Sequence, residues 1–304
     1  MSAKQLWELG EIYTSPLNLF LILLGVSYSR YENGSFFNGQ VLLYILLILF
    51  FHIAVNVFNN YMDYLNASDE HEYKMKTNII GRENLSLKTV RTTFIIFLAV
   101  ATLLGVLLAW QTNWVLLILG LIGFYIGLFY SAGPKPLNSL PIAETVTSLA
   151  SGFFVPLVGA YLSDFSHTPL TIQFVGKVLL VCLPTVLMMF NNLLANNTCD
   201  LEEDIVNGRK TLVYYLGKAR SVTVTKITFL FSFVWLFVLA FLGLAPWTVL
   251  LLVVLLPKSW KNLQAYFHVQ DKQKTFPIVL KALGGIMIWY PVLYCVGSFL
   301  PALF

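Results

Sequence analysis

Residues 191–212 read NNLLANNTCDLEEDIVNGRKTL and directly follow an apolar run, VLLVCLPTVLMMF. If this segment is helical, one row of polar side chains recurs every four residues: Asn192, Asn196, Asp200 and Asp204. At about 1.5 Å rise and 100° per residue, neighbours in that row lie about 6 Å apart on nearly one helix face. Two carboxylates at that spacing repel each other unless a cation or water lies between them. Beside an apolar run of membrane length, the pattern favours a cation.

An earlier segment contains the same frame. Residues 56–69 read NVFNNYMDYLNASD and close the apolar run 41–55. Both segments contain Asn-Asn-x-x-Asp, at 59–63 and at 196–200. Because each copy lies at the end of a hydrophobic run, the repetition indicates two half-sites that face each other.

Composition sets the class of protein. Of the 304 residues, 58% are apolar and only 11% are charged, whereas a soluble domain has roughly 25% charged residues. Long apolar runs therefore predict an all-α, polytopic membrane protein in contact with the lipid bilayer. The formal charge of +4 does not indicate a nucleic-acid partner, because the basic residues lie in short loops.

The apolar runs predict nine transmembrane helices, at 14–30, 41–64, 92–110, 114–131, 143–163, 174–196, 222–243, 246–257 and 278–303. With the N-terminus in the cytoplasm, every Lys and Arg except Arg30 and Lys177 falls on the cytoplasmic side, as the positive-inside rule requires. Both Asn/Asp frames then lie at the cytoplasmic rim. Pro257 is expected to end the eighth span. Pro184 is expected to kink the sixth, with neighbouring helices satisfying the carbonyl that it frees.

The polar residues suggest a chemistry. Asp and Asn provide the hard oxygen ligands that Mg²⁺ prefers, and two acidic clusters flanked by Arg and Lys suit a diphosphate leaving group. Apolar surroundings suit an isoprenoid tail. Aromatic rings at the same end are candidates to stabilise an allylic cation, or they form an interfacial belt: Phe58, Tyr61, Tyr64, Tyr125 and Tyr130.

Glu144 is the main charge within a span. It lies at the start of the fifth span, after the loop 131–142. An acid at this depth indicates a functional site, but a first-turn acid that complements the helix dipole explains it equally well. Both interpretations stay open.

Together these motifs resemble the UbiA superfamily of intramembrane aromatic prenyltransferases. The family's first motif, N-D-x-x-D with a further acid, is matched at 59–63 with Asp69, except that Asn60 stands in place of the first aspartate. Its second motif, D-x-x-x-D, is matched by Asp200 and Asp204. The chain is most similar to the 1,4-dihydroxy-2-naphthoate polyprenyltransferase branch, through the Asn pair at 191–192, GRKTL at 208–212, and YSAGPKPL at 130–137 followed by Glu144.

The resemblance implies a fold and a reaction. It implies a single domain over 1–304, with nine helices around a central cavity and two pseudo-repeated halves, about 1–140 and 141–304. It implies a multi-pass protein of the cell membrane whose active site opens toward the cytoplasm. The implied reaction joins a polyprenyl chain from an all-trans polyprenyl diphosphate to 1,4-dihydroxy-2-naphthoate. CO₂ and diphosphate are lost, and demethylmenaquinol is formed.

Site residues follow from the same resemblance. The expected Mg²⁺ ligands are Asn59, Asp63, Asp69, Asn196, Asp200 and Asp204. Catalytic roles are expected for Asp63, Asp200, Asp204 and Tyr130. Candidate contacts to diphosphate or substrate are Arg82, Lys135, Arg209, Lys210, Asn192 and Glu144. For Arg82 and Lys135, positive-inside topology is an equal explanation, and for the basic residues between the last two spans it is the favoured one.

Two alternatives remain. One is a prenyltransferase of the same superfamily with another aromatic acceptor, such as 4-hydroxybenzoate. The other is a cation-coupled secondary transporter, which would place its site near the bilayer midplane on broken helices. The frames at the cytoplasmic rim disfavour transport.

Overall fold

The structure is a computed structural model that describes residues 1–67 and 73–300. Every regular element in these ranges is a helix, as the sequence predicts. The chain forms two compact units, Met1–Leu19 with Gly39–Leu137, and Phe20–Asn38 with Asn138–Phe304. Each unit is described by itself.

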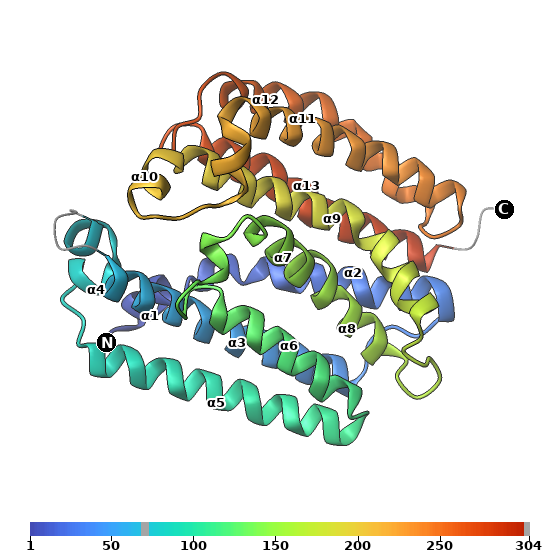
Figure 1. Cartoon of the computed structure of the whole chain (residues 1–304). Coiled ribbons are helices and arrows are strands. Elements are labelled where there is room, and N and C mark those ends of the chain that lie inside the picture. The colour runs from blue at the N-terminus through green and yellow to red at the C-terminus, as the bar shows by residue number, and fades with distance from the viewer. Residues whose placement is uncertain (68–72, 301–304) are drawn as a thin grey trace. The chain divides into compact units, whose positions relative to one another are not determined.

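The first unit contains two long apolar helices and one shorter one. Its elements are α1 (Ala3–Leu9), a 3-10 turn (Ile12–Thr14), α3 (Gly39–Asn66), a π-helical turn (Tyr73–Thr77), α4 (Ile79–Arg82), α5 (Leu87–Gln111) and α6 (Val115–Phe129). α3 and α5 pack along each other (Figure 1). At one end, Leu9, Val57 and Ile80 belong to a buried apolar cluster that joins α1, α3 and α4. This cluster fixes the end of α3 that bears the first Asn/Asp frame.

The second unit is built around α9. Its elements are most of α2 (Pro16–Asn33), α7 (Ala143–Leu149), a π-helical turn (Ala150–Phe154), α8 (Val155–Ser163), α9 (Ile172–Cys199), α10 (Leu201–Val206), α11 (Leu212–Phe241), a 3-10 stretch (Trp247–Leu255), α12 (Leu256–His268) and α13 (Phe276–Phe299). α9 packs against both α11 and α13 (Figure 1). Its C-terminal end bears the second frame.

Pro184 lies inside α9, as expected, and a neighbouring helix satisfies the carbonyl that it frees. Proline has no N–H to donate to the carbonyl four residues earlier. That carbonyl, of Leu180, instead accepts from the Trp235 indole N–H at 2.9 Å. The next carbonyl, of Val181, accepts from the Tyr290 hydroxyl at 2.8 Å. Side chains of α11 and α13 therefore bond to the α9 backbone at the proline.

Seven helices in the described residues are long and apolar enough to cross a membrane. They cover the predicted spans except the fourth and the eighth. The fourth corresponds to the shorter α6. The eighth span is predicted to end at Pro257, but in the structure the helical segment continues past this residue. The 3-10 stretch passes into α12, with Pro257 in its first turn, where a missing N–H costs nothing.

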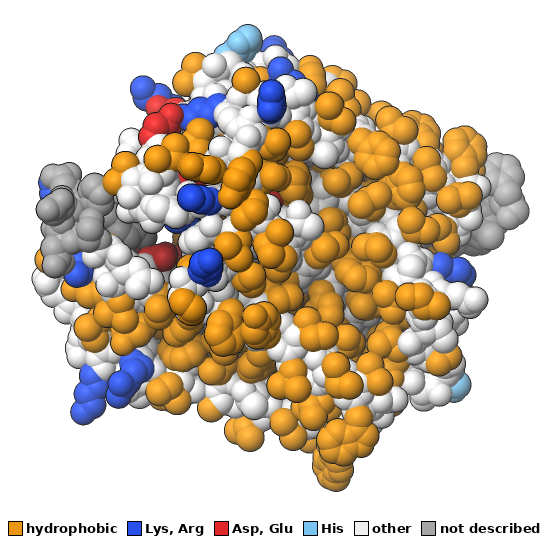
Figure 2. Space-filling view, viewed as in Figure 1, with side chains coloured by type: hydrophobic (Ala, Val, Ile, Leu, Met, Phe, Trp, Pro, Cys, Tyr) orange, Lys and Arg blue, Asp and Glu red, His pale blue; other side chains and the backbone are white. Residues whose placement is uncertain are grey.

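The surface agrees with a membrane location. Hydrophobic side chains cover most of the face in Figure 2, and few charges interrupt them. Large apolar side chains such as Leu103, Trp110 and Ile172 are more than two-thirds exposed. Exposed apolar side chains on long helices are stable in contact with lipid.

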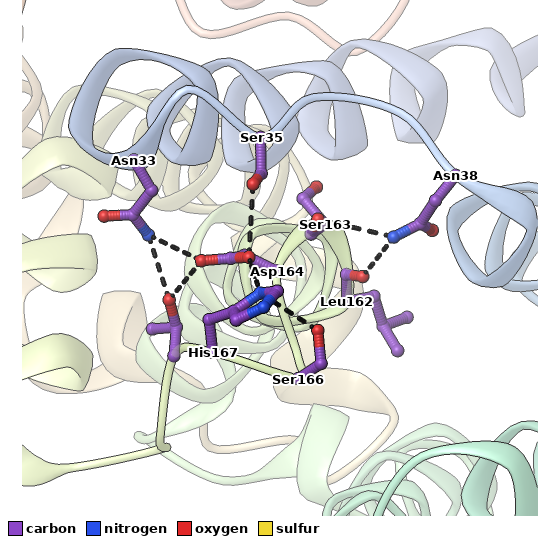
Figure 3. Close-up of polar contacts among 9 residues, drawn as sticks. Asn33, Ser35, Asn38, Leu162, Ser163, Asp164, Ser166 and His167 are labelled. Carbon is purple, nitrogen blue, oxygen red and sulfur yellow. Dashed lines mark hydrogen bonds and ion pairs between the residues drawn. The ribbon is translucent and has the colours of Figure 1, made fainter.

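A hydrogen-bonded cluster around Asp164 lies at the start of α9, at the end opposite the second frame. The Asp164 carboxylate is buried and accepts from Asn33, Ser35 and Thr168, and His167 lies 3.1 Å away (Figure 3). Burial alone would raise the pKa of Asp164, but the hydrogen bonds from Thr168, His167 and Ser35 outweigh it and lower the pKa below 3.8. Hydroxyl, amide and imidazole groups thus hold this carboxylate, which joins α2 to the loop before α9.

We predict that Asp164→Ala lowers stability by about 1–3 kcal/mol near pH 7, because several donors lose their acceptor. A carboxylate with a lowered folded pKa stabilises the protein above its unfolded pKa, and this stabilisation is lost as pH falls through the folded value. The difference between wild type and variant should therefore close in acid. Thermal unfolding in detergent across pH measures it. Ser166→Ala, which removes only a contact to His167, is the matched control. A difference that persists in acid would contradict the assigned role.

Candidate functional site

The second Asn/Asp frame lies where α9 ends and α10 begins. The sequence pattern puts four polar side chains on one face if the segment is helical; in the structure the helix is interrupted at Asp200, which caps α9 and precedes α10. The four-residue spacing survives the interruption. The Asp200 N–H donates to the Asn196 carbonyl at 3.1 Å, and the Asp204 N–H donates to the Asp200 carbonyl at 2.8 Å. The predicted row of polar side chains is therefore retained.

The ammonium group of a lysine contacts two residues of this row, Asn196 and Asp200. The Lys272 ammonium donates to Asn196 Oδ1 at 2.7 Å and forms an ion pair with Asp200 Oδ2. The Asn196 amide also donates to Asp200 Oδ2, at 3.2 Å. The positive charge expected between these oxygens is thus supplied by a lysine from the loop before α13.

Asp204 is buried and is only partly compensated. Its Oδ1 pairs with Arg209 Nη1 at 2.9 Å, while Oδ2 has no hydrogen-bond partner among the described residues. Burial raises the pKa of Asp204 to about 6, the Arg209 guanidinium opposes this, and the negative charges of Asp200 and Glu203 add to it. One carboxylate oxygen of Asp204 is therefore buried without a compensating partner among the described residues.

The basic turn after α10 is locked to the loop 138–139. Arg209 Nη2 donates to the Asn138 carbonyl at 2.9 Å, and the Lys210 N–H donates to the Ser139 carbonyl at 3.0 Å. Gly208 has a φ of +70°, which glycine adopts without strain. The turn directs the Arg209 guanidinium at Asp204, whereas the Lys210 ammonium lies 5.7 Å from the Tyr214 ring centre.

Glu144 and the asparagines of α9 add further polar atoms. Glu144 is fully buried, and its Oε1 accepts from Asn197 Nδ2 at 2.8 Å, while Oε2 has no partner among the described residues. Asn191 accepts from the Thr228 hydroxyl at 2.6 Å. Asn192 Oδ1 is buried without a partner in the described residues. A fully buried carboxylate oxygen without a donor is costly unless a ligand satisfies it.

The first frame lies near the end of α3. Asn59 Oδ1 accepts from the Ser131 hydroxyl at 2.8 Å, and Tyr130, which precedes that serine, caps the C-terminal end of α6. Asp63 is half-buried. Burial raises the pKa of Glu11, and the negative charge of Asp63 raises it further. Glu11 is therefore a further acid beside this frame.

Asn60 has a structural role. Its amide donates to the Leu9 carbonyl at 3.1 Å and to the Asn56 carbonyl at 3.2 Å, and its own carbonyl accepts from Asn78 at 3.0 Å. An aspartate at this position has no N–H to donate. This explains physically why Asn60 stands where the family motif has an acid.

The remaining predicted residues differ in their surroundings. Asp69 lies outside the described residues. Arg82 pairs with Glu8 and, at 3.7 Å, with Glu83. Lys135 is exposed in the loop after α6. No three His, Cys, Asp or Glu side chains gather into a cluster that could hold a metal ion within the described ranges.

Besides Glu11, two residues of this site were not singled out from the sequence. Lys272 is one of several lysines between the last two spans, and a count of loop charges does not distinguish it. Asn197 is the second asparagine of the frame 196–200, but only its contact with Glu144 shows what it does.

The chain belongs to the UbiA prenyltransferase family, whose model matches residues 18–301. It is 28% identical over 246 residues to the 1,4-dihydroxy-2-naphthoate octaprenyltransferase of Bacillus subtilis (strain 168). The matched region covers 80% of this chain and 76% of that protein. It is 23% identical over 303 residues to the enzyme of the same name from Haemophilus influenzae, with 97% and 95% covered.

The fold is also that of a solved relative. A UbiA homologue from Archaeoglobus fulgidus, bound to DMAPP and Mg²⁺, superposes with a TM-score of 0.61 at 14% identity, covering 97% of this chain and all of that one. Family membership and the apolar helices together define a multi-pass membrane protein.

We predict that Asn60→Asp destabilises the protein by about 1–3 kcal/mol, because two backbone carbonyls lose their donor and meet a negative charge. Asn66→Asp, the same change at an exposed position of α3, is the control and should have little effect. Thermal unfolding of both variants in detergent measures the difference. Equal stabilities would show that the hydrogen bonds of Asn60 do not matter.

Proposed function

We propose that this protein transfers a polyprenyl chain from an all-trans polyprenyl diphosphate to 1,4-dihydroxy-2-naphthoate. CO₂ and diphosphate are released, and demethylmenaquinol is formed. Family membership and the names of the two relatives support this. The observation that carries the proposal is the pair Asp200 and Asp204, two acids at the end of an apolar helix, each already facing a cation.

The proposal includes an architecture. Nine helices span the membrane around a central cavity, the N-terminus is cytoplasmic, and both frames lie at the cytoplasmic rim. Arg30 and Lys177, the two basic residues assigned to the opposite side, support this orientation, because each has a hydrogen-bond or ion-pair partner. Arg30 donates to the Gly34 carbonyl at 2.6 Å, and Lys177 pairs with Glu32.

The residues of the two frames fit Mg²⁺. Asn196 and Asp200 already coordinate an ammonium, and Asp204 has a buried, unpartnered oxygen. The proposed ligands are Asn59, Asp63, Asp69, Asn196, Asp200 and Asp204. Bound Mg²⁺ would neutralise charge on the diphosphate leaving group.

Basic side chains take the outer oxygens of the diphosphate. Arg209 is held in place by Asp204 and the Asn138 carbonyl and presents a planar donor group. Lys210 and Lys135 are exposed and free to reach a phosphate. Arg82 has to exchange Glu8 for the substrate. The donor C–O bond breaks with both electrons on the diphosphate, and the Tyr130 ring face stabilises the allylic cation.

The acceptor lies against Glu144. The unpartnered Oε2 of Glu144 accepts a hydrogen bond from a ring hydroxyl, and Asn197 holds the other oxygen. The electron-rich ring forms a C–C bond to the allylic carbon. The bond to the carboxylate then breaks, and its electron pair restores the aromatic ring. Asn192, with its own unpartnered oxygen, lies one turn before Asn196 and is assigned to substrate binding.

The test uses the purified full-length protein in detergent with Mg²⁺, a polyprenyl diphosphate and 1,4-dihydroxy-2-naphthoate. We expect prenylated naphthoquinol by mass spectrometry and an equal amount of CO₂. Turnover with 4-hydroxybenzoate but not with the naphthoate would overturn the acceptor and keep the class. No turnover with any aromatic acceptor would overturn the proposed function.

We further predict that Asp63→Ala and Asp200→Ala each lower turnover by about 10²–10³-fold, the loss typical of removing one group that stabilises the leaving charge. Glu203→Ala is the matched control, because this acid lies one residue before Asp204 but is exposed. Size-exclusion profiles should match wild type. Near-wild-type activity of both variants would remove the proposed metal role.

A further inference from the structure

We propose that Lys272 is an intramolecular competitor for the metal at the second frame, and that it leaves this position when the diphosphate arrives. This inference rests on the proposed function. Lys272 Nζ lies within hydrogen-bonding distance of Asn196 Oδ1 and Asp200 Oδ2, two of the six proposed ligands. A lysine ammonium and Mg²⁺ cannot share the same carboxylate oxygen and amide oxygen at bonding distance.

The loop that bears Lys272 holds it in place. Asp271 Oδ1 accepts from the N–H groups of Gln273 and Lys274, at 2.9 and 2.8 Å. The Thr275 hydroxyl accepts from the Asp271 N–H at 2.9 Å and donates to the Val269 carbonyl at 2.9 Å. These bonds close a tight turn between α12 and α13, so the position of the Lys272 backbone does not depend on its ion pair.

The side chain also has a second contact. Lys272 Nζ lies 5.1 Å from the centre of the Phe276 ring, in the first turn of α13. Its side chain is nearly half exposed, whereas the Asp200 side chain is only 17% exposed. An ammonium on a four-carbon chain at the surface can move away from a fixed carboxylate without any backbone change.

This arrangement makes metal binding depend on the substrate. Without diphosphate, a metal ion has to displace Lys272, which loses its ion pair. With diphosphate present, the released ammonium gains a new anionic partner. Two ligands that each favour the same displaced state bind cooperatively, and the coupling is reciprocal. Lys272 thereby disfavours loading of metal before the donor.

The experiment measures Mn²⁺ binding to the full-length protein in detergent, by electron paramagnetic resonance, with and without inorganic pyrophosphate. In Lys272→Met, the Kd for Mn²⁺ without pyrophosphate should fall by about two- to fivefold, the range of a partly exposed ion pair. The factor by which pyrophosphate tightens Mn²⁺ binding should shrink. Lys274→Met is the matched control, being exposed in the same turn, and should match wild type.

The outcomes separate this proposal from the proposed function. If Asp200→Ala abolishes Mn²⁺ binding while Lys272→Met leaves the Kd unchanged or raises it, the competitor role is overturned and the metal site stands. If wild type binds no Mn²⁺ even with pyrophosphate, both proposals fail. Equal tightening by Lys272→Met and Lys274→Met would reduce the effect to net charge and would also overturn the competitor role.

Discussion

A carboxylate at the end of an apolar helix has to be compensated locally, because neither lipid nor a protein interior solvates it. The second unit meets this requirement at both ends of α9. Asp164, before the helix, is held by neutral hydroxyl and amide donors. Asp200 and Asp204, after it, face Lys272 and Arg209. Neutral donors fix a carboxylate permanently, whereas a mobile cation can be exchanged for another. The carboxylate before α9 is therefore held by a network of several donors, whereas the carboxylates after it each face a basic side chain.

The two Asn/Asp frames use their asparagines in a similar way. In each frame the second asparagine bonds to a supporting element: Asn60 to the Leu9 carbonyl, and Asn197 to Glu144. The first asparagine keeps its oxygen among the other polar groups of the frame, where Asn59 accepts from Ser131 and Asn196 from Lys272. The repeated sequence frame therefore corresponds to a repeated pattern of contacts, in which the second asparagine donates to a neighbouring element and the first accepts a hydrogen bond.

Much of this fold could be predicted from the sequence, because the apolar runs have membrane length and the Lys and Arg residues follow loop topology. The compensation of the carbonyl that Pro184 frees inside α9 was also predictable in kind. What could not be predicted depends on tertiary contacts. The break at Asp200 occurs within a segment whose spacing suits an unbroken helix. Hydropathy does not show that Asn60 bonds to α1. Nor does a charge count distinguish Lys272 from its neighbours, since its placement depends on the turn around Asp271.

The hydrogen bonds at Pro184 have a mechanical consequence. The indole of Trp235 bonds to the Leu180 carbonyl, which lacks its helical donor because of Pro184, and the hydroxyl of Tyr290 adds a bond to the Val181 carbonyl, so separating α9 from α11 would leave the Leu180 oxygen without a donor in an apolar medium. These two hydrogen bonds tie α9 to both α11 and α13. Movement of α9 relative to α11 or α13 would have to break one of these hydrogen bonds, so α9 is expected to keep its place beside both helices.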